Sequence, residues 1–326
     1  MTFSLASSKS RTIRRCLLSI LIVLFTVTIR VTAEEPLKTS ICQLKKDPPA
    51  YNHKLVEITA FATHASHNFT AYDPNCPSWP TIWLEYGGTI NSGTVNCCKT
   101  LNDRHRSQPL VVDDITIPLT VNQQFQDFDK SIQPPLPAGQ SGAVEHATLI
   151  GRFFAGQRLE DPDNGHYWGG YGYMGCCSML VIQEVKDPDT HWRADLDYGE
   201  SNEKLDFSRQ GCTLRMLLPE EQDAALLQAQ HDADSGTRDW AFSDPARVAA
   251  DTLANTAHLG HDAAAVKLTH DSPARKTYEW KSAGNSRNYM VVVSRPYWLS
   301  FYAHDPSRVA WVAVIAYEST CGGIAE

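Results

Sequence analysis

The chain has 326 residues, with 29 Lys and Arg against 37 Asp and Glu and a formal net charge of −8 at pH 7. An acidic surface repels phosphate backbones and anionic lipid headgroups, so the composition argues against nucleic-acid binding. A chain of this length is typical of about two domains, and it can bury a core without depending on disulfides or metals.

The first 33 residues have the pattern of a secretory signal peptide. A basic stretch precedes the apolar run Cys16–Ile29, and the small residues that follow predict cleavage between Ala33 and Glu34. The apolar run has 14 residues, whereas a membrane-spanning helix needs roughly 20, so we expect no membrane span after cleavage. Cleavage would remove five basic and no acidic residues, which leaves 24 basic against 37 acidic residues and a net charge of −13. We therefore expect an exported protein, periplasmic or extracellular.

The first half of the remaining chain has mainly β patterns. Residues 36–50 predict a short helix, capped by Thr39 or Ser40 and stopped by the two prolines Pro48 and Pro49. Alternation of apolar and polar residues, with many β-formers, then predicts a series of strands. These strands cover 54–67, 68–77, 81–86, 146–157 and 177–187.

Two segments interrupt this series of strands. Residues 87–142 are rich in Gly, Pro and polar side chains and form a long insertion, with one strand-like piece at 113–121. Residues 162–175 form a loop rich in Gly and Tyr, directly before the adjacent cysteines Cys176 and Cys177. Five short strands separated by turns predict a small β-barrel.

The composition changes after an acidic, linker-like stretch at 187–204. Alanine-rich segments predict helices over 219–234 and 244–258, the second with Asp244 as its N-cap and Pro245 at its first position. Three strands follow, over 274–282, 288–302 and 309–320. Helices followed by strands favour a helix layer on an antiparallel sheet.

The predicted fold class is α+β and mainly β. After the signal peptide at 1–33, residues 34–195 form an OB-like β-barrel that carries the insertion, and residues 196–326 form a smaller α+β domain with an antiparallel sheet.

The first half also carries a characteristic set of motifs. They are Cys42-Gln-Leu, Pro48-Pro-Ala-Tyr51-Asn-His-Lys54-Leu-Val56-Glu-Ile58, Tyr72-Asp-Pro-Asn-Cys76, Ile82-Trp-Leu-Glu85, Gly151-Arg-Phe-Phe154 and Gly175-Cys-Cys-Ser178. Over residues 40–187 the chain resembles a family of uncharacterised exported bacterial proteins whose N-terminal part is an OB-fold-like barrel. The resemblance implies the barrel and carries no activity. His53 departs from the pattern, because the family has Gly in that turn.

Eight cysteines follow the predicted cleavage site, and in an oxidising compartment they are expected to form disulfides. The candidates are Cys42, Cys76, Cys97, Cys98, Cys176, Cys177, Cys212 and Cys321. We expect Cys212 to bridge Cys321 within the second domain, and the other six to pair among themselves. A link between the adjacent pairs Cys97-Cys98 and Cys176-Cys177 would tie the insertion to the barrel.

The adjacent pairs allow two other interpretations. Neighbouring residues rarely present both sulfurs to one zinc ion, although His105 and His166 lie near enough in sequence for a mixed site. Redox chemistry favours a Cys-x-x-Cys motif at a helix start, and neither pair precedes a predicted helix. A disulfide within either pair would be strained. We therefore predict no metal site and no cofactor.

Aromatic residues gather in the loops of the predicted barrel. The weak candidates for a binding surface are Trp79, Tyr167, Trp168, Tyr171 and Tyr173. OB-type barrels bind oligomers on a strand face and adjoining loops, and aromatic faces stack on sugars or pack on peptides. The same side chains would also serve as core that covers the barrel ends.

The motifs Gly-x-Ser-x-Gly, the P-loop and His-Glu-x-x-His are absent from the sequence, so no catalytic residue is predicted. The leading hypothesis is a non-catalytic binding or envelope-associated module with a glycan or protein partner. The alternative is a hydrolase whose site lies at the domain junction and uses scattered Asp, His and Ser.

Overall fold

The computed structural model describes residues 34–65, 68–77, 79–92, 104–132, 143–161, 165–189, 193–198, 214–218, 222–259, 265–281 and 287–320. The predicted signal peptide and four cysteines (Cys97, Cys98, Cys212 and Cys321) lie outside these residues. Of the helices in the described ranges, none combines the length and the apolar character that crossing a membrane requires.

The structure is mixed α and β, and mostly β. The first half contains β1 (Leu37–Lys38), α2 (Ile41–Lys46), α3 (Pro48–Tyr51), β2 (Leu55–Ala65), β3 (Asn68–Tyr72), β4 (Ile82–Tyr86), β5 (Val111–Val112), β6 (Ile115–Thr116), α4 (Gln123–Ile132), β7 (Ala143–Phe154), β8 (Gln157–Asp161), β9 (Gly165–Gly169), the 3₁₀ helix η1 (Tyr173–Gly175) and β10 (Ser178–Lys186). The second half contains β11 (Leu214–Met216), α5 (Asp223–Asp234), η2 (Asp239–Phe242), α6 (Pro245–Ala257), β12 (Lys267–Asp271), β13 (Arg275–Lys281), β14 (Asn288–Ser294), η4 (Tyr297–Phe301) and β15 (Val312–Ser319).

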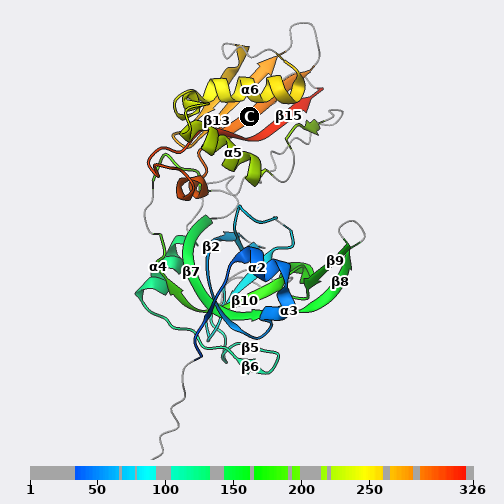
Figure 1. Ribbon diagram of the computed structural model, residues 1–326, viewed down its shortest axis with the longest axis vertical. Coiled ribbons are helices and arrows are strands. Elements are labelled where there is room, and N and C mark those ends of the chain that lie inside the picture. The colour runs from blue at the N-terminus through cyan, green and yellow to red at the C-terminus, as the bar shows by residue number, and fades with distance from the viewer. Residues whose placement is uncertain are drawn as a thin grey trace, which may run out of the picture. The chain divides into compact units, whose positions relative to one another are not determined.

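Five strands of the first half close into a barrel, in the order β2-β3-β4-β10-β7 with β7 paired back to β2 (Figure 1). Neighbouring strands of the barrel are antiparallel except β4 and β10, which are parallel. Strand alternation sends every second residue of β2 into the core: Val56, Ile58, Ala60 and Ala62 are all at most 2% exposed. The predicted barrel is therefore present.

Helix α4 lies within the predicted insertion and contacts β7, β10 and β2. The sequence QQFQDFDKSI looks polar overall, but Phe125, Phe128 and Ile132 are spaced i, i+3 and i+7 and are buried in the barrel core. Of the strand-like piece predicted at 113–121, only Ile115–Thr116 forms a strand, which is β6. Asp113 and Asp114, both with positive φ, form instead the two-residue turn of the β5–β6 hairpin, as in a type I′ turn.

Two turns before the barrel follow simple backbone rules. Ser40 caps α2, since its hydroxyl accepts a hydrogen bond from the backbone N–H of Gln43 at 3.3 Å. His53, which stands where the resemblance predicts Gly, has a φ of 61°, in the left-handed region that favours glycine.

The second half forms a separate antiparallel sheet in the order β11-β15-β14-β13-β12, and Figure 1 shows α5 and α6 on one face of it. Asp244 caps α6 by accepting a hydrogen bond from the N–H of Arg247 at 3.0 Å, and Pro245 occupies the first helical position, as predicted.

The predicted strand over 288–302 is too long. β14 ends at Ser294, because Pro296 cannot donate to a strand ladder, and the chain continues as the 3₁₀ helix η4. The edge strands β11 and β12 were not predicted, since both are short or largely exposed and lack a clean apolar alternation.

Candidate functional site

The chain between β7 and β10 builds an elaborate connection on the barrel. β8 and β9 pair as an antiparallel hairpin, which projects from the barrel in Figure 1. Residues 170–177 then return to the start of β10. The sequence predicted one continuous loop over 162–175, but Tyr167 and Trp168 lie in β9 and pair across the hairpin with Leu159 and Arg158.

Backbone hydrogen bonds close the loop 170–177 on itself. Tyr171 and Cys177 exchange two of them, at 3.0 and 3.1 Å, and the N–H of Gly170 donates to the carbonyl of Gly175 at 2.9 Å. Gly172 has a φ of 74°, and a Cβ atom there would lie 2.6 Å from the indole ring of Trp83. The loop is thus packed directly onto Trp83, at a distance that only glycine allows.

Cys176 and Cys177 form a disulfide with each other, across Cα atoms 3.7 Å apart. The predicted link from this pair to Cys97-Cys98 is therefore wrong. Two features of the backbone bring the neighbouring sulfurs together. Cys177 is held by its backbone hydrogen bonds to Tyr171, and Cys176 has a helical backbone at the end of η1. Cys177 is buried and its sulfur lies 3.1 Å from the hydroxyl of Thr81. With both sulfurs bonded to each other, neither is a thiolate ligand for a metal ion.

A second disulfide joins Cys42 in α2 to Cys76 after β3, with Cα atoms 5.3 Å apart and a sequence separation of 34. This pairing agrees with the expectation that Cys42 and Cys76 bond within the first half. A side-chain oxygen of Asp73 lies within 4.8 Å of both sulfurs. The three groups do not make a metal site here, because disulfide sulfurs are not thiolate ligands.

Tyr171 anchors the loop 170–177 through contacts with Phe154 and Asp113. It lies against the ring of Phe154, and its hydroxyl donates to Asp113 at the tip of the β5–β6 hairpin, at 3.3 Å. Burial, followed by the negative charge of Asp113, raises the pKa of Tyr171 to about 12, so the phenol stays a neutral donor. The other contact of Asp113 is with the Nε2 atom of His53 at 2.9 Å. A carboxylate from the insertion therefore fastens the aromatic loop to the barrel.

Three of the predicted aromatic residues reach the surface. The Trp79 ring, 37% exposed, lies 5.5 Å from the ring of Tyr167, and Tyr173 is 40% exposed. Next to Tyr173 the tip residue Met174 is 87% exposed and adopts a left-handed backbone with a φ of 56°. We call Trp79, Tyr167, Tyr173 and Met174 the aromatic surface.

The members of the aromatic surface are neighbours. A Cβ atom at Gly169 would lie 3.0 Å from the ring of Tyr167 and 2.9 Å from the carbonyl oxygen of Gly175, so the Tyr167 ring lies beside the turn that carries Tyr173 and Met174. A left-handed backbone is uncommon for a non-glycine residue.

Two other predicted aromatics serve as support. Trp168 is half-buried and packs against the barrel core, and Tyr171 is held by Phe154 and Asp113 as described. Trp83 in β4 is likewise only 5% exposed beneath the loop. The alternative interpretation, in which aromatics cover the barrel end, thus holds for these three.

Sequence reasoning missed Asp113 and Met174. Asp113 lies 58 residues before Tyr171, and only the fold brings the two together. Met174 offered one signal, because it is an apolar residue within a loop rich in glycine and tyrosine.

Comparison of the chain with protein-family models, with curated proteins and with solved structures finds no match. The fold and the site define the class by themselves: a closed five-stranded barrel that presents a tightly packed aromatic loop, followed by an α+β unit with an antiparallel sheet.

Proposed function

We propose that the protein is an exported, non-catalytic binding module that holds a glycan on the aromatic surface of an OB-type barrel. The observation that carries this proposal is the exposure of Trp79, before β4, and of Tyr173 and Met174 on a loop that is fixed by glycine packing, a disulfide and a half-buried tyrosine.

The strand order supports the OB assignment. Counted along the chain, the barrel strands run 1-2-3-5-4 with the fourth strand paired back to the first, and the third and fifth strands are the parallel pair. Helix α4 lies between the third and fourth strands. In OB-folds, the connection between strands four and five is one of two loops that bind oligosaccharides and oligonucleotides, and here it carries Tyr167, Tyr173 and Met174 of the aromatic surface.

The chemistry of the surface favours a sugar over a nucleic acid. Aromatic rings stack on the apolar face of a sugar ring, and rings held in place lose little conformational entropy on binding. The polar side chains of Glu160 and His166 face each other across the β8–β9 hairpin, where they offer carboxylate oxygens and ring nitrogens as hydrogen-bond partners for hydroxyl groups. The net charge of −8 disfavours a polyanion.

The hydrolase alternative, with its site at the domain junction, draws no support from the cavity in the α+β unit. The cavity described below is lined by apolar side chains, one Arg, one Gln and one Thr, and its lining contains neither a carboxylate nor an imidazole. General acid–base catalysis requires such groups within hydrogen-bond reach of the substrate.

The test is a glycan array probed with residues 34–326, followed by calorimetry on the strongest ligand. We expect Trp79→Ala and Tyr173→Ala to weaken binding by about tenfold or more each, as loss of a stacking ring does at a small interface. Leu268→Ala is the matched control, because Leu268 is 42% exposed on β12, outside the barrel.

Equal losses in all three variants, or no loss in the two aromatic variants, would contradict the proposal. If no glycan binds and one protein partner is captured through Trp79 and Tyr173, the ligand of the aromatic surface is a protein and the glycan proposal is wrong.

A further inference from the structure

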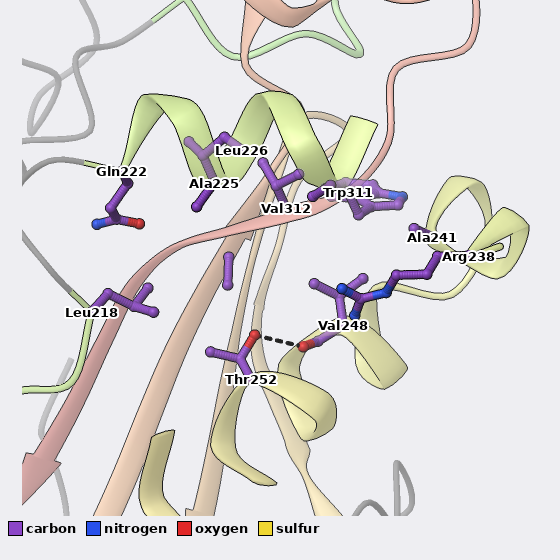
Figure 2. A pocket seen from close by; sticks show the side chains of 12 residues that line it. Leu218, Gln222, Ala225, Leu226, Arg238, Ala241, Val248, Thr252, Trp311 and Val312 are labelled. Atoms are coloured by element: carbon purple, nitrogen blue, oxygen red, sulfur yellow. Dashed lines mark hydrogen bonds between the residues drawn. The ribbon is translucent and has the colours of Figure 1, made fainter. Parts of the chain in front are cut away.

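The α+β unit contains a cavity of about 160 Å³ between its two helices and the start of β15 (Figure 2). Its lining comes from α5, η2, α6, β15 and the residue Leu218 after β11. The lining residues are Leu218, Gln222, Ala225, Leu226, Ala229, Arg238, Ala241, Val248, Thr252, Trp311, Val312 and Ala313. This cavity is independent of the aromatic surface on the barrel.

Small side chains create the cavity. Ala225 and Ala229 are spaced i and i+4 on α5, so they share one face of that helix. Val248 and Thr252 have the same spacing on α6, and the hydroxyl of Thr252 is satisfied within its own helix by the carbonyl of Val248 at 2.8 Å. The cavity is partly open to solvent, because Ala225 in its lining is exposed.

The walls are apolar and the two ends are polar. Figure 2 shows the amide of Gln222 and the side chain of Leu218 at one end and the guanidinium of Arg238 toward the other, with Leu226 and Val312 between them. Such a pattern, an apolar body with few polar groups that fix orientation, is typical of a small-molecule site.

Arg238 has donors to spare within the described part of the chain. Its Nη2 atom contacts Asp251 at 3.3 Å, and its guanidinium lies over the ring of Trp240 at 4.9 Å. A guanidinium has five N–H donors in a fork that matches a carboxylate, and one long contact with Asp251 leaves most of them available. Arg247 lies over the same Trp240 ring at 4.2 Å and adds positive charge nearby.

We propose that this cavity binds a small monocarboxylate with a compact apolar body, its carboxylate paired with Arg238. A volume of about 160 Å³ is close to the ~150 Å³ of an apolar cavity that holds benzene, and it is below the roughly 300 Å³ at which drug-sized sites begin. One aromatic ring or one short branched chain therefore fills it. Trp311 in the lining favours the aromatic ring.

Phenylacetate is the probe, titrated into residues 34–326 by calorimetry and by ligand-observed NMR. Phenylacetamide and 2-phenylethylamine have nearly the same shape without the negative charge. We expect phenylacetate to bind with a dissociation constant of about 1 mM or tighter. The amide should bind about tenfold more weakly because it loses the charged pair, and the amine should bind more weakly still.

Two pairs of variants locate the site. Ala229→Leu fills the cavity and should abolish binding, whereas Ala224→Leu on the exposed face of the same helix should not. Arg238→Gln should weaken phenylacetate about tenfold and leave the affinity for the amide unchanged. Arg247→Gln removes a charge from the same neighbourhood without touching the lining, and should have a small effect.

Three results would overturn the proposal: no phenylacetate binding at about 20 mM, a concentration that detects even very weak complexes; equal binding of phenylacetate and the amine; or binding that survives Ala229→Leu. The comparison of the three probes needs no variant, so it stands even if Arg238→Gln fails to fold.

Discussion

Gly172 lies directly against the indole ring of Trp83, so that a Cβ atom added to it would be 2.6 Å from the ring. This contact seats the aromatic loop on the barrel and removes Trp83 from the surface, where it is only 5% exposed. The loop is therefore not a free appendage, since its position depends on the absence of one methyl group.

Gly172→Ala should displace the loop and destabilise the protein. Gly165 is the matched control, because its φ of 79° is also left-handed but nothing lies within 4 Å of its Cβ position. Gly165→Ala should cost about 1 kcal/mol for the backbone conformation alone. Gly172→Ala should cost about 1–3 kcal/mol more, because the methyl group overpacks the contact with Trp83. Urea unfolding of both variants measures the difference, and equal costs would contradict the packing described.

The two disulfides should contribute unequally to stability. In the chain-entropy model, loss of a link across 34 residues costs about 3–4 kcal/mol, while loss of a link between neighbours costs about 1 kcal/mol. We expect the Cys42→Ser/Cys76→Ser variant to lose far more unfolding free energy than Cys176→Ser/Cys177→Ser.

Peptide mapping of the unreduced protein checks the pairing itself. A peptide that contains both Cys176 and Cys177 should be two hydrogens lighter than its thiol form and linked to no other peptide. A cross-link from either cysteine to another segment would contradict the structure.

Tyr171 and Asp113 should be energetically coupled. A double-mutant cycle with Tyr171→Phe and Asp113→Asn should give a coupling of about 0.5–1 kcal/mol, the value of a partly exposed hydrogen bond to a charged group. His53→Ala removes the other partner of Asp113 and serves as the control. A coupling near zero would show that Asp113 does not fasten the loop.

Glu145 should make the protein less stable as the pH rises. The side chain is 4% exposed on β7, and burial raises its pKa to about 8, while a hydrogen bond from Ser131 lowers it and the charge of Asp189 raises it. The folded state then holds a proton that the unfolded state releases near pH 4.5. The contribution of protonated Glu145 to the free energy of unfolding is fully present below pH 4.5 and is lost as the pH rises through about 8.

Glu145→Gln should remove this dependence. Urea unfolding from pH 4 to 9 should show the variant gaining on the wild type with rising pH, by at most about 5 kcal/mol. The comparison with the wild type is needed, because burial lowers the pKa of His64 and His146 and gives the opposite slope. A constant difference between the two proteins across this range would contradict the raised pKa.

The sequence predicts strands where apolar and polar side chains alternate. It does not predict contacts between segments that are distant in the chain. The strands β2, β4 and β10 lie within the predicted segments, because burial on one face imposes a period of two. The polar run that forms α4 was missed, since three apolar residues in ten are a weak helix signal until the barrel core is known.

The candidate site could likewise be predicted from the sequence only in part. The residues Tyr167, Trp168, Tyr171 and Tyr173 were named from composition, but their separation into exposed and supporting side chains depends on Trp83 and Asp113, which are remote in sequence. Disulfide pairing also depends on backbone geometry, so the bond between Cys176 and Cys177 could not be chosen over its alternatives.

The exposed tip of the aromatic loop gives the protein an internal chemical reporter. Among the described methionines, Met174 is 87% exposed and Met216 on β11 is 48% exposed, whereas Met179 and Met290 are buried. Mild peroxide should therefore convert Met174 to the sulfoxide first, with Met216 as a reference in the other half of the chain. Any molecule that covers the tip will slow the oxidation of Met174 relative to Met216, so one mass spectrum reports occupancy without a label.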